Sequence, residues 1–325
     1  MKYLKVRIPG ETIEIPYLKI KGKKGDQRCI IAGGMHGDEV NGIALVQRFL
    51  EYCKKKDIEN HLRGELIIFP ILNESGFKNH QRNVAYDNKD LNRCFNKKGK
   101  TASIKIANAL EKQFFSKCDI AIDCHDSGKR NILIPHTRVH GYEKRTCAEC
   151  TKEMAKAFGS KLIIERDGKR GMLAVEMMKQ HGIPVLTIEI GGALKVADKF
   201  LDKGLEGIIN VLKYVRMLPG NPKIPQKQYY LRDRYGVLAK DSGLIRFKKK
   251  LGQRVHRGDF IGDIYVPTKA KSYNLISPVC GLLFSLQHSD QIATGEIMYS
   301  ILEDKKCHVR RQTVQHFEEI KNIEM

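Results

Sequence analysis

Short apolar runs of strand-like composition alternate with longer amphipathic stretches over the first two thirds of the chain. Strand-like runs occur near Cys29–Ala32, Glu65–Leu72, Asp119–Cys124, Asn131–Pro135 and Pro184–Ile190. Stretches with apolar residues at helical spacing occur near Asn41–Lys56, Ala102–Ser116, Thr146–Phe158, Leu173–His181 and Ala197–Met217. Runs of this length suit strands, and the longer periodic stretches suit helices. The alternation therefore predicts an α/β fold in which helices flank a sheet.

A cluster of prolines and glycine at Leu218–Pro225 follows the last helical stretch. Such a cluster breaks a helix and marks a domain boundary. Between Gly236 and Leu302 the pattern changes to short apolar runs separated by glycine, which is typical of a small β domain. We therefore predict a larger domain over 1–218, a small β domain over 229–305 and a C-terminal tail over 306–325.

Composition indicates a globular, cytoplasmic protein. The 325 residues are 42% hydrophobic, which is enough to bury a core. No apolar run is long enough to span a membrane, and the first residues lack the apolar core of a signal peptide. The nine cysteines are scattered, so we expect reduced thiols rather than a disulfide framework. The pair Cys147 and Cys150, a single C-x-x-C, is weak support for a redox or structural role.

The formal net charge of +21 raises the question of a nucleic-acid partner. The basic residues are spread along the chain, with short clusters at Lys21–Lys24, Lys54–Lys56 and Lys248–Lys250, and no aromatic residues are interleaved with them as in a recognition motif. This distribution favours a solvated basic surface over nucleic-acid binding. Such a surface would also draw anionic substrates toward a site.

Potential metal ligands stand at the ends of two strand-like runs. His36 and Glu39 follow the run Cys29–Ala32 in a glycine-rich turn, and His125 ends the run Asp119–Cys124. Parallel sheets present functional side chains at the carboxyl ends of their strands, so these three residues can converge. Two histidines and a glutamate form a standard ligand set for catalytic zinc. Taken alone, the His36 and Glu39 pair also fits a solvated turn.

Two further segments carry polar residues suited to catalysis. Arg82 precedes Asp90-Leu91-Asn92-Arg93-Cys94-Phe95, a segment with little apolar periodicity, in which Asn92 and Arg93 would suit a substrate carboxylate. Glu189 lies inside the apolar run Pro184–Ile190, where an acid usually has a partner or a task. A glutamate beside a zinc-bound water can take its proton. A solvated loop and an edge-strand glutamate are the alternative interpretations.

Together these segments resemble the succinylglutamate desuccinylase and aspartoacylase family, a branch of the zinc carboxypeptidase superfamily. The family pattern has Gly-x-His-Gly-x-Glu, an arginine before Asp-Leu-Asn-Arg-x-Phe, a strand ending in Asp-x-His, and Thr-x-Glu-x-Gly. This chain carries all four in that order between residues 28 and 192. It departs from the pattern at Ala85, Asn88 and Asn96, where proline, glycine and proline are common.

The resemblance implies one zinc ion per chain, held by His36, Glu39 and His125. It implies that Glu189 is the general base that activates water. Asp90 would orient the imidazole of His36 by accepting its other N–H, as carboxylates commonly do behind metal-bound histidines.

The resemblance also implies a substrate and a fold. Arg82 would polarise the scissile carbonyl, while Asn92 and Arg93 would hold the substrate carboxylate. The reaction would be hydrolysis of the amide bond of a small N-acyl amino acid, without a covalent intermediate. The catalytic domain would be a mixed eight-stranded sheet between helices, as in zinc carboxypeptidases.

A weak repeat characterises the predicted β domain. Ser242-Gly243-Leu244-Ile245 is echoed about 37 residues later by Cys280-Gly281-Leu282-Leu283. The repeat resembles the two halves of a biotinyl or lipoyl-like barrel-sandwich domain. No Met-Lys-Met turn accompanies it, so we expect no carrier lysine. We expect the domain either to shape the pocket or to form a contact in a homo-oligomer.

Two alternative functions remain open at this point. A metallocarboxypeptidase would use the same zinc, base and Asn-Arg pair on a peptide, and an open groove would favour it over a covered pocket. A non-catalytic, basic nucleic-acid-binding protein would show salt-sensitive binding. The complete ligand set favours the deacylase.

Overall fold

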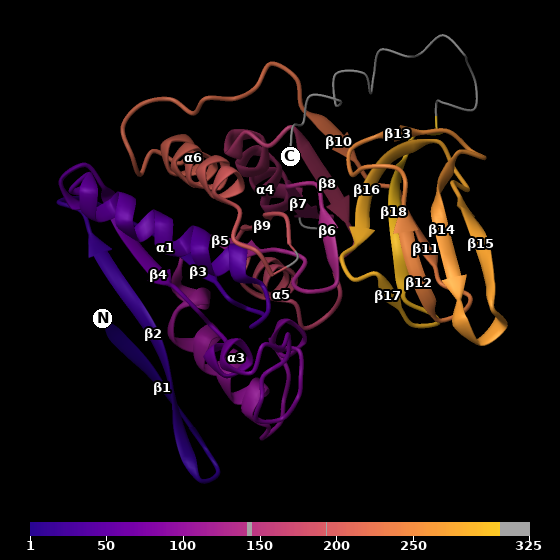
Figure 1. Ribbon diagram of the computed structural model, residues 1–325. Helices are drawn as coiled ribbons and strands as arrows, with labels where there is room; N and C mark the ends of the chain where they lie inside the picture. The colour runs from indigo at the N-terminus through magenta and orange to yellow at the C-terminus, as the bar shows by residue number, and fades with distance from the viewer. Residues whose placement is uncertain (142–144, 193, 306–325) are drawn as a thin grey trace. The chain divides into compact units, whose positions relative to one another are not determined.

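The computed structural model describes residues 1–141, 145–192 and 194–305 (Figure 1). The chain divides into two compact units. The first unit comprises Met1–Gly128 and Pro135–Tyr230, and the second comprises Lys129–Ile134 and the described chain from Leu231 to Lys305. The predicted tail over 306–325 lies outside the described residues.

A nine-stranded mixed sheet forms the centre of the first unit (Figure 1). Its strands lie in the order β1 (Lys2–Ile8), β2 (Glu11–Lys21), β4 (Arg63–Phe69), β3 (Lys24–Gly33), β5 (Ile120–His125), β9 (Val185–Glu189), β7 (His136–His140), β8 (Leu162–Arg166) and β10 (Tyr229–Leu231). The neighbours β4, β3, β5 and β9 are parallel, whereas β2 and β7 run antiparallel to this group. The predicted α/β fold with a mixed sheet is confirmed, with nine strands rather than eight.

Helices cover both faces of this sheet. The helices are α1 (Val40–Lys55), α2 (Glu74–Lys78), α3 (Ala102–Gln113), α4 (Arg145–Phe158), α5 (Leu173–Glu176) and α6 (Asp198–Tyr214). Shorter turns are η1 (Ile58–Asn60), η2 (Leu91–Arg93), η3 (Phe115–Lys117), η5 (Pro267–Lys269) and the π-helical η4 (Met177–His181). Apolar residues of α1, α4 and α6 bury one face of the sheet, and those of α3 and α5 bury the other. No described helix has the length and apolarity needed to cross a membrane.

The period of apolar residues explains why these helices pack as they do. In α1, Leu45, Phe49 and Cys53 recur every fourth residue, and all three are buried against the sheet. Residues at this spacing share one helical face. The helix that the pattern predicts over Leu173–His181 is α5 continued by the wider turn η4.

The second unit contains two antiparallel sheets. One has the order β11 (Arg234–Leu238), β18 (Ile297–Glu303), β16 (Gly281–Gln287) and β13 (Arg254–Val255), with β6 (Asn131–Leu133) also paired to β16. The other has the order β15 (Lys271–Ile276), β14 (Phe260–Val266), β12 (Gly243–Phe247) and β17 (Gln291–Ile292). The pairings of the described strands leave both sheets open rather than closed into a barrel.

Two features of this unit bear on the sequence predictions. The echoed segments begin equivalent strands, β12 at Gly243 and β16 at Gly281, so the repeat is a repeat of strands. The run Asn131–Pro135, which the pattern groups with the strands of the larger domain, instead supplies β6. Its partner in the sheet is β16, with Leu133 opposite Ser285.

Candidate active site

The candidate site lies where three parallel strands end. β3 ends at Gly33 and leads into the loop that carries His36 and Glu39, β5 ends at His125, and β9 ends at Glu189. His125 and Glu189 are direct partners across the β5–β9 pair. The carboxyl ends of parallel strands meet at one edge of the sheet, so residues far apart in sequence are brought together there.

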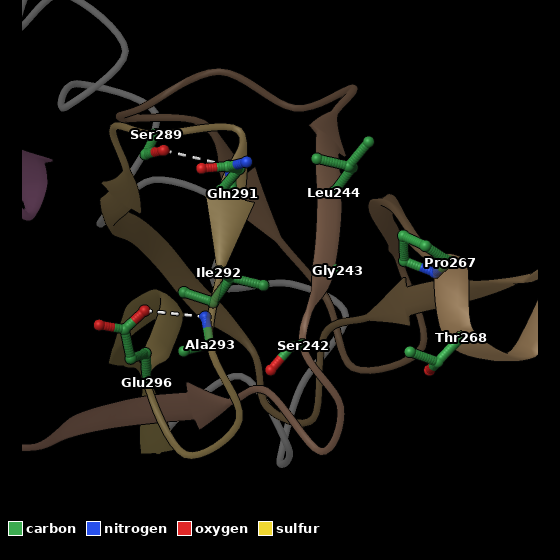
Figure 2. Close-up of a pocket in the computed structure, with 10 residues that line it drawn as sticks. All are labelled: Ser242, Gly243, Leu244, Pro267, Thr268, Ser289, Gln291, Ile292, Ala293 and Glu296. Atoms are coloured by element: carbon green, nitrogen blue, oxygen red, sulfur yellow. Dashed lines mark hydrogen bonds between the residues drawn. The ribbon is translucent and has the colours of Figure 1, made fainter.

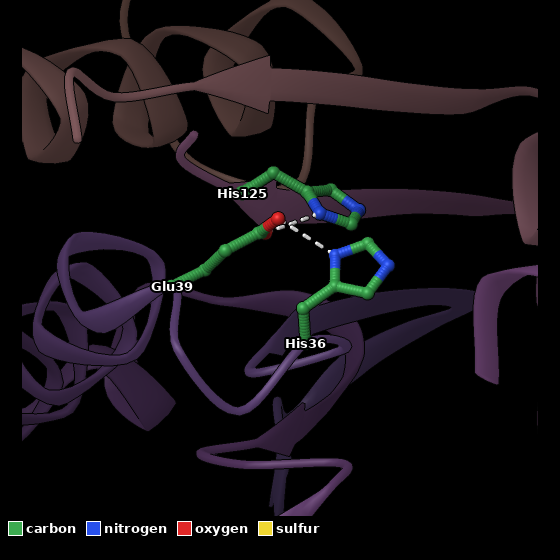
Figure 3. A group of neighbouring side chains, drawn as sticks. All are labelled: His36, Glu39 and His125. Atoms are coloured by element: carbon green, nitrogen blue, oxygen red, sulfur yellow. Dashed lines mark hydrogen bonds and ion pairs between the residues drawn. The ribbon is translucent and has the colours of Figure 1, made fainter. Parts of the chain in front are cut away.

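His36, Glu39 and His125 form a buried cluster whose ligand atoms all lie within 4.8 Å of one another. Figure 3 shows the two imidazoles turned toward the Glu39 carboxylate between them. The Nδ1 atom of His36 lies 2.7 Å from Oε1 of Glu39, and Nδ1 of His125 lies 2.7 Å from Oε2. Among the described residues this is the one group of three or more such side chains that could hold a metal ion.

Each histidine has a carboxylate behind it. Nε2 of His36 lies 3.0 Å from Oδ1 of Asp90, and Nε2 of His125 lies 2.8 Å from Oδ2 of Asp123. Burial would raise the pKa of Asp90, but His36 and Arg82 hold that pKa below its usual range. With Nε2–H donated to the carboxylate behind it, each imidazole would offer the lone pair of Nδ1 to a metal bound at the centre of the cluster.

This donor set fits a zinc ion. Two imidazole nitrogens and one carboxylate are the protein ligands of many catalytic zinc sites, which keep a further position for water or substrate. Burial would raise the pKa of Glu39, but His36 and His125 hold that pKa well below its usual value, so the carboxylate is ionised as a ligand must be. The three residues and their two outer carboxylates therefore suit a catalytic metal.

Arg82 bridges two acids of the cluster. Its Nη1 donates to Oε1 of Glu39 at 3.0 Å, and its Nε and Nη2 donate to Oδ2 of Asp90 at 3.3 and 3.2 Å. The loop that carries His36 and Glu39 also contacts the loop of Arg82 through the backbone: the amide of Gly37 donates to the carbonyl of Arg82 at 3.3 Å. A Cβ on Gly37 would lie 2.0 Å from the carbonyl carbon of Gly76. Only glycine allows this approach without a shift of the loop.

The structure places Asn92 and Arg93 beside Asp90, in η2. The amide of Asn92 donates to Oδ1 of Asp90 at 2.9 Å, which begins this short turn, and Oδ1 of Asn92 accepts from the amide of Leu173 at 2.8 Å. Asn92 is buried, whereas the side chain of Arg93 is 34% exposed and donates to the carbonyl of Asn92. Arg93 is thus the more accessible of the two predicted substrate-binding residues.

Glu189 is buried but not alone. Its side chain is 7% exposed, and its Oε1 accepts from Nη2 of Arg138 at 2.8 Å. The sheet therefore places the predicted base next to His125 on one side and a guanidinium on the other.

Residues that the sequence motifs do not assign also contribute. Asp123 supports His125, and its spacing in Asp-x-His is a usable signal, because residues two apart on a strand point to the same face. Asp126 accepts from the amides of Asn41 and Gly128, and burial together with Glu39 raises the pKa of Asp126 to about 7. Nothing in the sequence pattern marks Asp126 as different from an ordinary loop aspartate.

A separate hollow lies in the second unit, around β12 and β17 (Figure 2). Its one ionisable lining residue is Glu296, whose carboxylate accepts from the amide of Ala293 at 2.9 Å. The remaining lining residues are small, polar or aliphatic. The hollow therefore offers no cluster of metal ligands or nucleophiles.

Comparisons with known proteins indicate the family of this chain. A family model described as the succinylglutamate desuccinylase/aspartoacylase catalytic domain matches residues 26–215. The chain is 26% identical over 267 residues to N-alpha-acetyl-L-2,4-diaminobutyric acid deacetylase of Halomonas elongata, covering 80% of this chain and 76% of that protein. The region matched by the family model includes every residue of the candidate site.

Solved structures share the fold over almost the whole chain. A succinylglutamate desuccinylase from Silicibacter sp. TM1040 has a TM-score of 0.83 and 23% identity, covering 93% of this chain and 94% of that chain. The product-bound ectoine utilization protein EutE of Ruegeria pomeroyi has a TM-score of 0.84 and 22% identity, with the same coverage of 93% and 94%.

Proposed function

Because the chain belongs to the succinylglutamate desuccinylase/aspartoacylase family, we propose that it hydrolyses the amide bond of a small N-acyl amino acid. The observation that carries this proposal is the buried cluster of His36, Glu39 and His125, which would hold one zinc ion beside Glu189. A relative named as a deacetylase of an N-acetylated amino acid supports the same class of reaction.

The chain's own residues have distinct tasks in this reaction. Bound in the cluster, a zinc ion would polarise the acyl carbonyl and increase the acidity of a water molecule. Glu189 accepts the proton of that water and delivers it to the leaving amine. Arg82, anchored on Glu39 and Asp90, uses three of its five N–H groups for these contacts and has two left to donate to the developing oxyanion.

The substrate carboxylate is assigned to Arg93 with Asn92. Arg93 is partly exposed and its guanidinium can hold a carboxylate through two parallel hydrogen bonds. Hydrogen bonds with Asp90 and Leu173 fix Asn92, so it supports the position of Arg93. Its side-chain NH2 can also donate to the substrate carboxylate. A free α-carboxylate next to the scissile amide is therefore the feature we expect in the preferred substrate.

The first test measures metal content together with release of free amine from N-acetyl, N-succinyl and larger N-acyl amino acids. The same panel contains peptides with a free C-terminal residue, which a carboxypeptidase would remove. We expect about one zinc per chain and turnover of one of the N-acyl amino acids. Glu189→Gln should lower kcat by about 10²- to 10⁴-fold, because the variant keeps the shape of the side chain but cannot accept the proton.

Glu65→Gln is a matched control, since Glu65 lies on β4 and pairs with Lys19 and Arg28 away from the cluster. It should leave kcat unchanged. Metal-free protein that gains no turnover when zinc is added would contradict the proposal. Turnover of peptides alone would favour a carboxypeptidase instead.

A further inference from the structure

The proposed base makes an ion pair that its catalytic role alone does not require. Nη2 of Arg138 lies 2.8 Å from Oε1 of Glu189, and the two side chains are only 18% and 7% exposed. An ion pair on an exposed surface contributes little to stability. In a desolvated pair, loss of one partner leaves an unpaired buried charge, so separation of the two groups is costly. The pair therefore constrains how the Glu189 carboxylate can turn.

The sheet register explains how Arg138 reaches Glu189. β7 runs antiparallel to β9, with His136 opposite Glu189 and Arg138 opposite Thr187. Residues two apart on a strand share a face, so Glu189, Thr187 and Arg138 all project from the same side of the sheet. The long side chain of Arg138 spans the offset of one residue pair and contacts the carboxylate from the flank opposite to His125.

A second arginine reinforces this arrangement. Arg166 on β8 is opposite His140 on the same face, and no ion pair joins it to a carboxylate of the described chain. Burial and the charge of Arg138 lower the pKa of Arg166, while Glu189 opposes this effect. Burial, Arg138 and Arg166 also lower the pKa of His140 to about 3, so the imidazole adds no charge. Arg138 is thus the cation paired with Glu189, and Arg166 adds a second positive charge on the same face of the sheet.

We infer that Arg138 is a positioning residue for Glu189: it holds Oε1, so that Oε2 is the oxygen presented to the attacking water. This inference rests on the proposed function and extends it by one residue. Arg138 neither takes nor gives the proton. Its contribution is orientation, since a misplacement of about 1 Å in a reacting group can cost on the order of 10²-fold in rate.

The test compares Arg138→Gln, Arg138→Lys and a matched control with the wild-type, zinc-loaded enzyme. Arg138→Gln should lower kcat by about 10- to 100-fold and leave KM within about 2-fold, because the substrate contacts are intact. Arg138→Lys should recover part of kcat, since an ammonium keeps the charge but not the planar donor group. Arg48→Gln is the control, because Arg48 pairs with Asp198 and Asp202 outside the site.

A double-mutant cycle separates positioning from a structural role. If Arg138 acts through the carboxylate, Arg138→Gln should cost little further kcat once Glu189→Gln is present. Zinc content and melting temperature are measured for every variant. If Arg138→Gln does not fold, the same cycle is made with Arg138→Lys.

Three results would overturn the inference. Unchanged kcat in Arg138→Gln would show that Glu189 needs no such partner. A raised KM with unchanged kcat would show that Arg138 binds substrate instead. Additive losses in the double variant would show that Arg138 acts independently of Glu189. Each of these requires an active wild-type enzyme, whereas a wild-type protein without turnover on the whole panel would reject the proposed function itself.

Discussion

At the scale of single residues, the carboxylates behind the two histidines orient the imidazoles of the proposed metal site. Asp123 accepts from Nε2 of His125 at 2.8 Å, within a buried part of the sheet. Asp123→Asn should therefore weaken zinc binding by about 10- to 100-fold, because the amide no longer fixes the tautomer and orientation of the ring. Competition with a chelator of known affinity measures the effect.

A control variant makes that measurement specific. Asp290 is an exposed residue of the second unit, and Asp290→Asn should leave zinc affinity unchanged. Equal zinc affinity in Asp123→Asn and wild type would show that the contact with His125 does not support the metal.

At the scale of elements, the loop that carries His36 and Glu39 lies too close to the segment from Gly76 to Arg82 to leave room for a side chain at Gly37. Gly37→Ala should reduce stability by about 1 to 3 kcal/mol and lower zinc content, because a Cβ there meets the backbone of Gly76 and Phe77 rather than a flexible side chain. Chemical denaturation and metal analysis test both effects.

Gly236 provides the comparison for this steric effect. It lies on β11, and a Cβ there would have only ordinary contacts with Ile297, the nearest at 3.7 Å. Gly236→Ala should be close to neutral in stability. A Gly37→Ala protein as stable and as zinc-rich as wild type would mean that the loop of His36 and Glu39 can move away from Gly76 and Phe77 without loss of stability or of zinc.

The same scale shows which parts of the fold the sequence can predict. Helices such as α1 and the central strands are predictable, because their apolar residues recur with a local period. The strand β6 is predicted as well, but the sheet that it joins is not, because its partner β16 is distant in the sequence. β10 is not predicted, because a three-residue strand has no period of its own.

The candidate site divides in the same way. His36, Glu39 and His125 are predictable, since each stands in a short motif at a strand end, and the structure brings them together. Arg138 is not, because its place beside Glu189 follows from the register of β7 against β9 rather than from any local spacing. The catalytic roles of these residues stay predictions until the variants are measured.

At the scale of the whole molecule, His140 couples stability to pH. Its folded-state pKa of about 3 lies below the ordinary value of 6.5, so the unfolded chain binds this proton first as pH falls. The free energy of unfolding that depends on a neutral His140 is fully present above about pH 6.5 and is lost progressively toward pH 3, by up to about 5 kcal/mol. Denaturation in the presence of a chelator, across this range, measures the slope without contributions from metal release.

Replacement of the imidazole identifies its share of that slope. His140→Gln should flatten the dependence of unfolding free energy on pH between about 6.5 and 3. His61→Gln should keep the wild-type dependence, because His61 is exposed. An unchanged slope in His140→Gln would assign the acid sensitivity to other groups of this strongly basic chain.

The pairing of β6 with β16 in the second unit affects how the chain folds while it is synthesised on the ribosome. Leu133 is translated long before Ser285, its partner in the sheet. Until β16 emerges, β6 has no strand beside it, and contacts between such distant segments form slowly because a long loop must close first. The second unit therefore completes this sheet only after β16 has been synthesised, and a nascent chain that stalls before that point would expose an unpaired strand to chaperones or to aggregation.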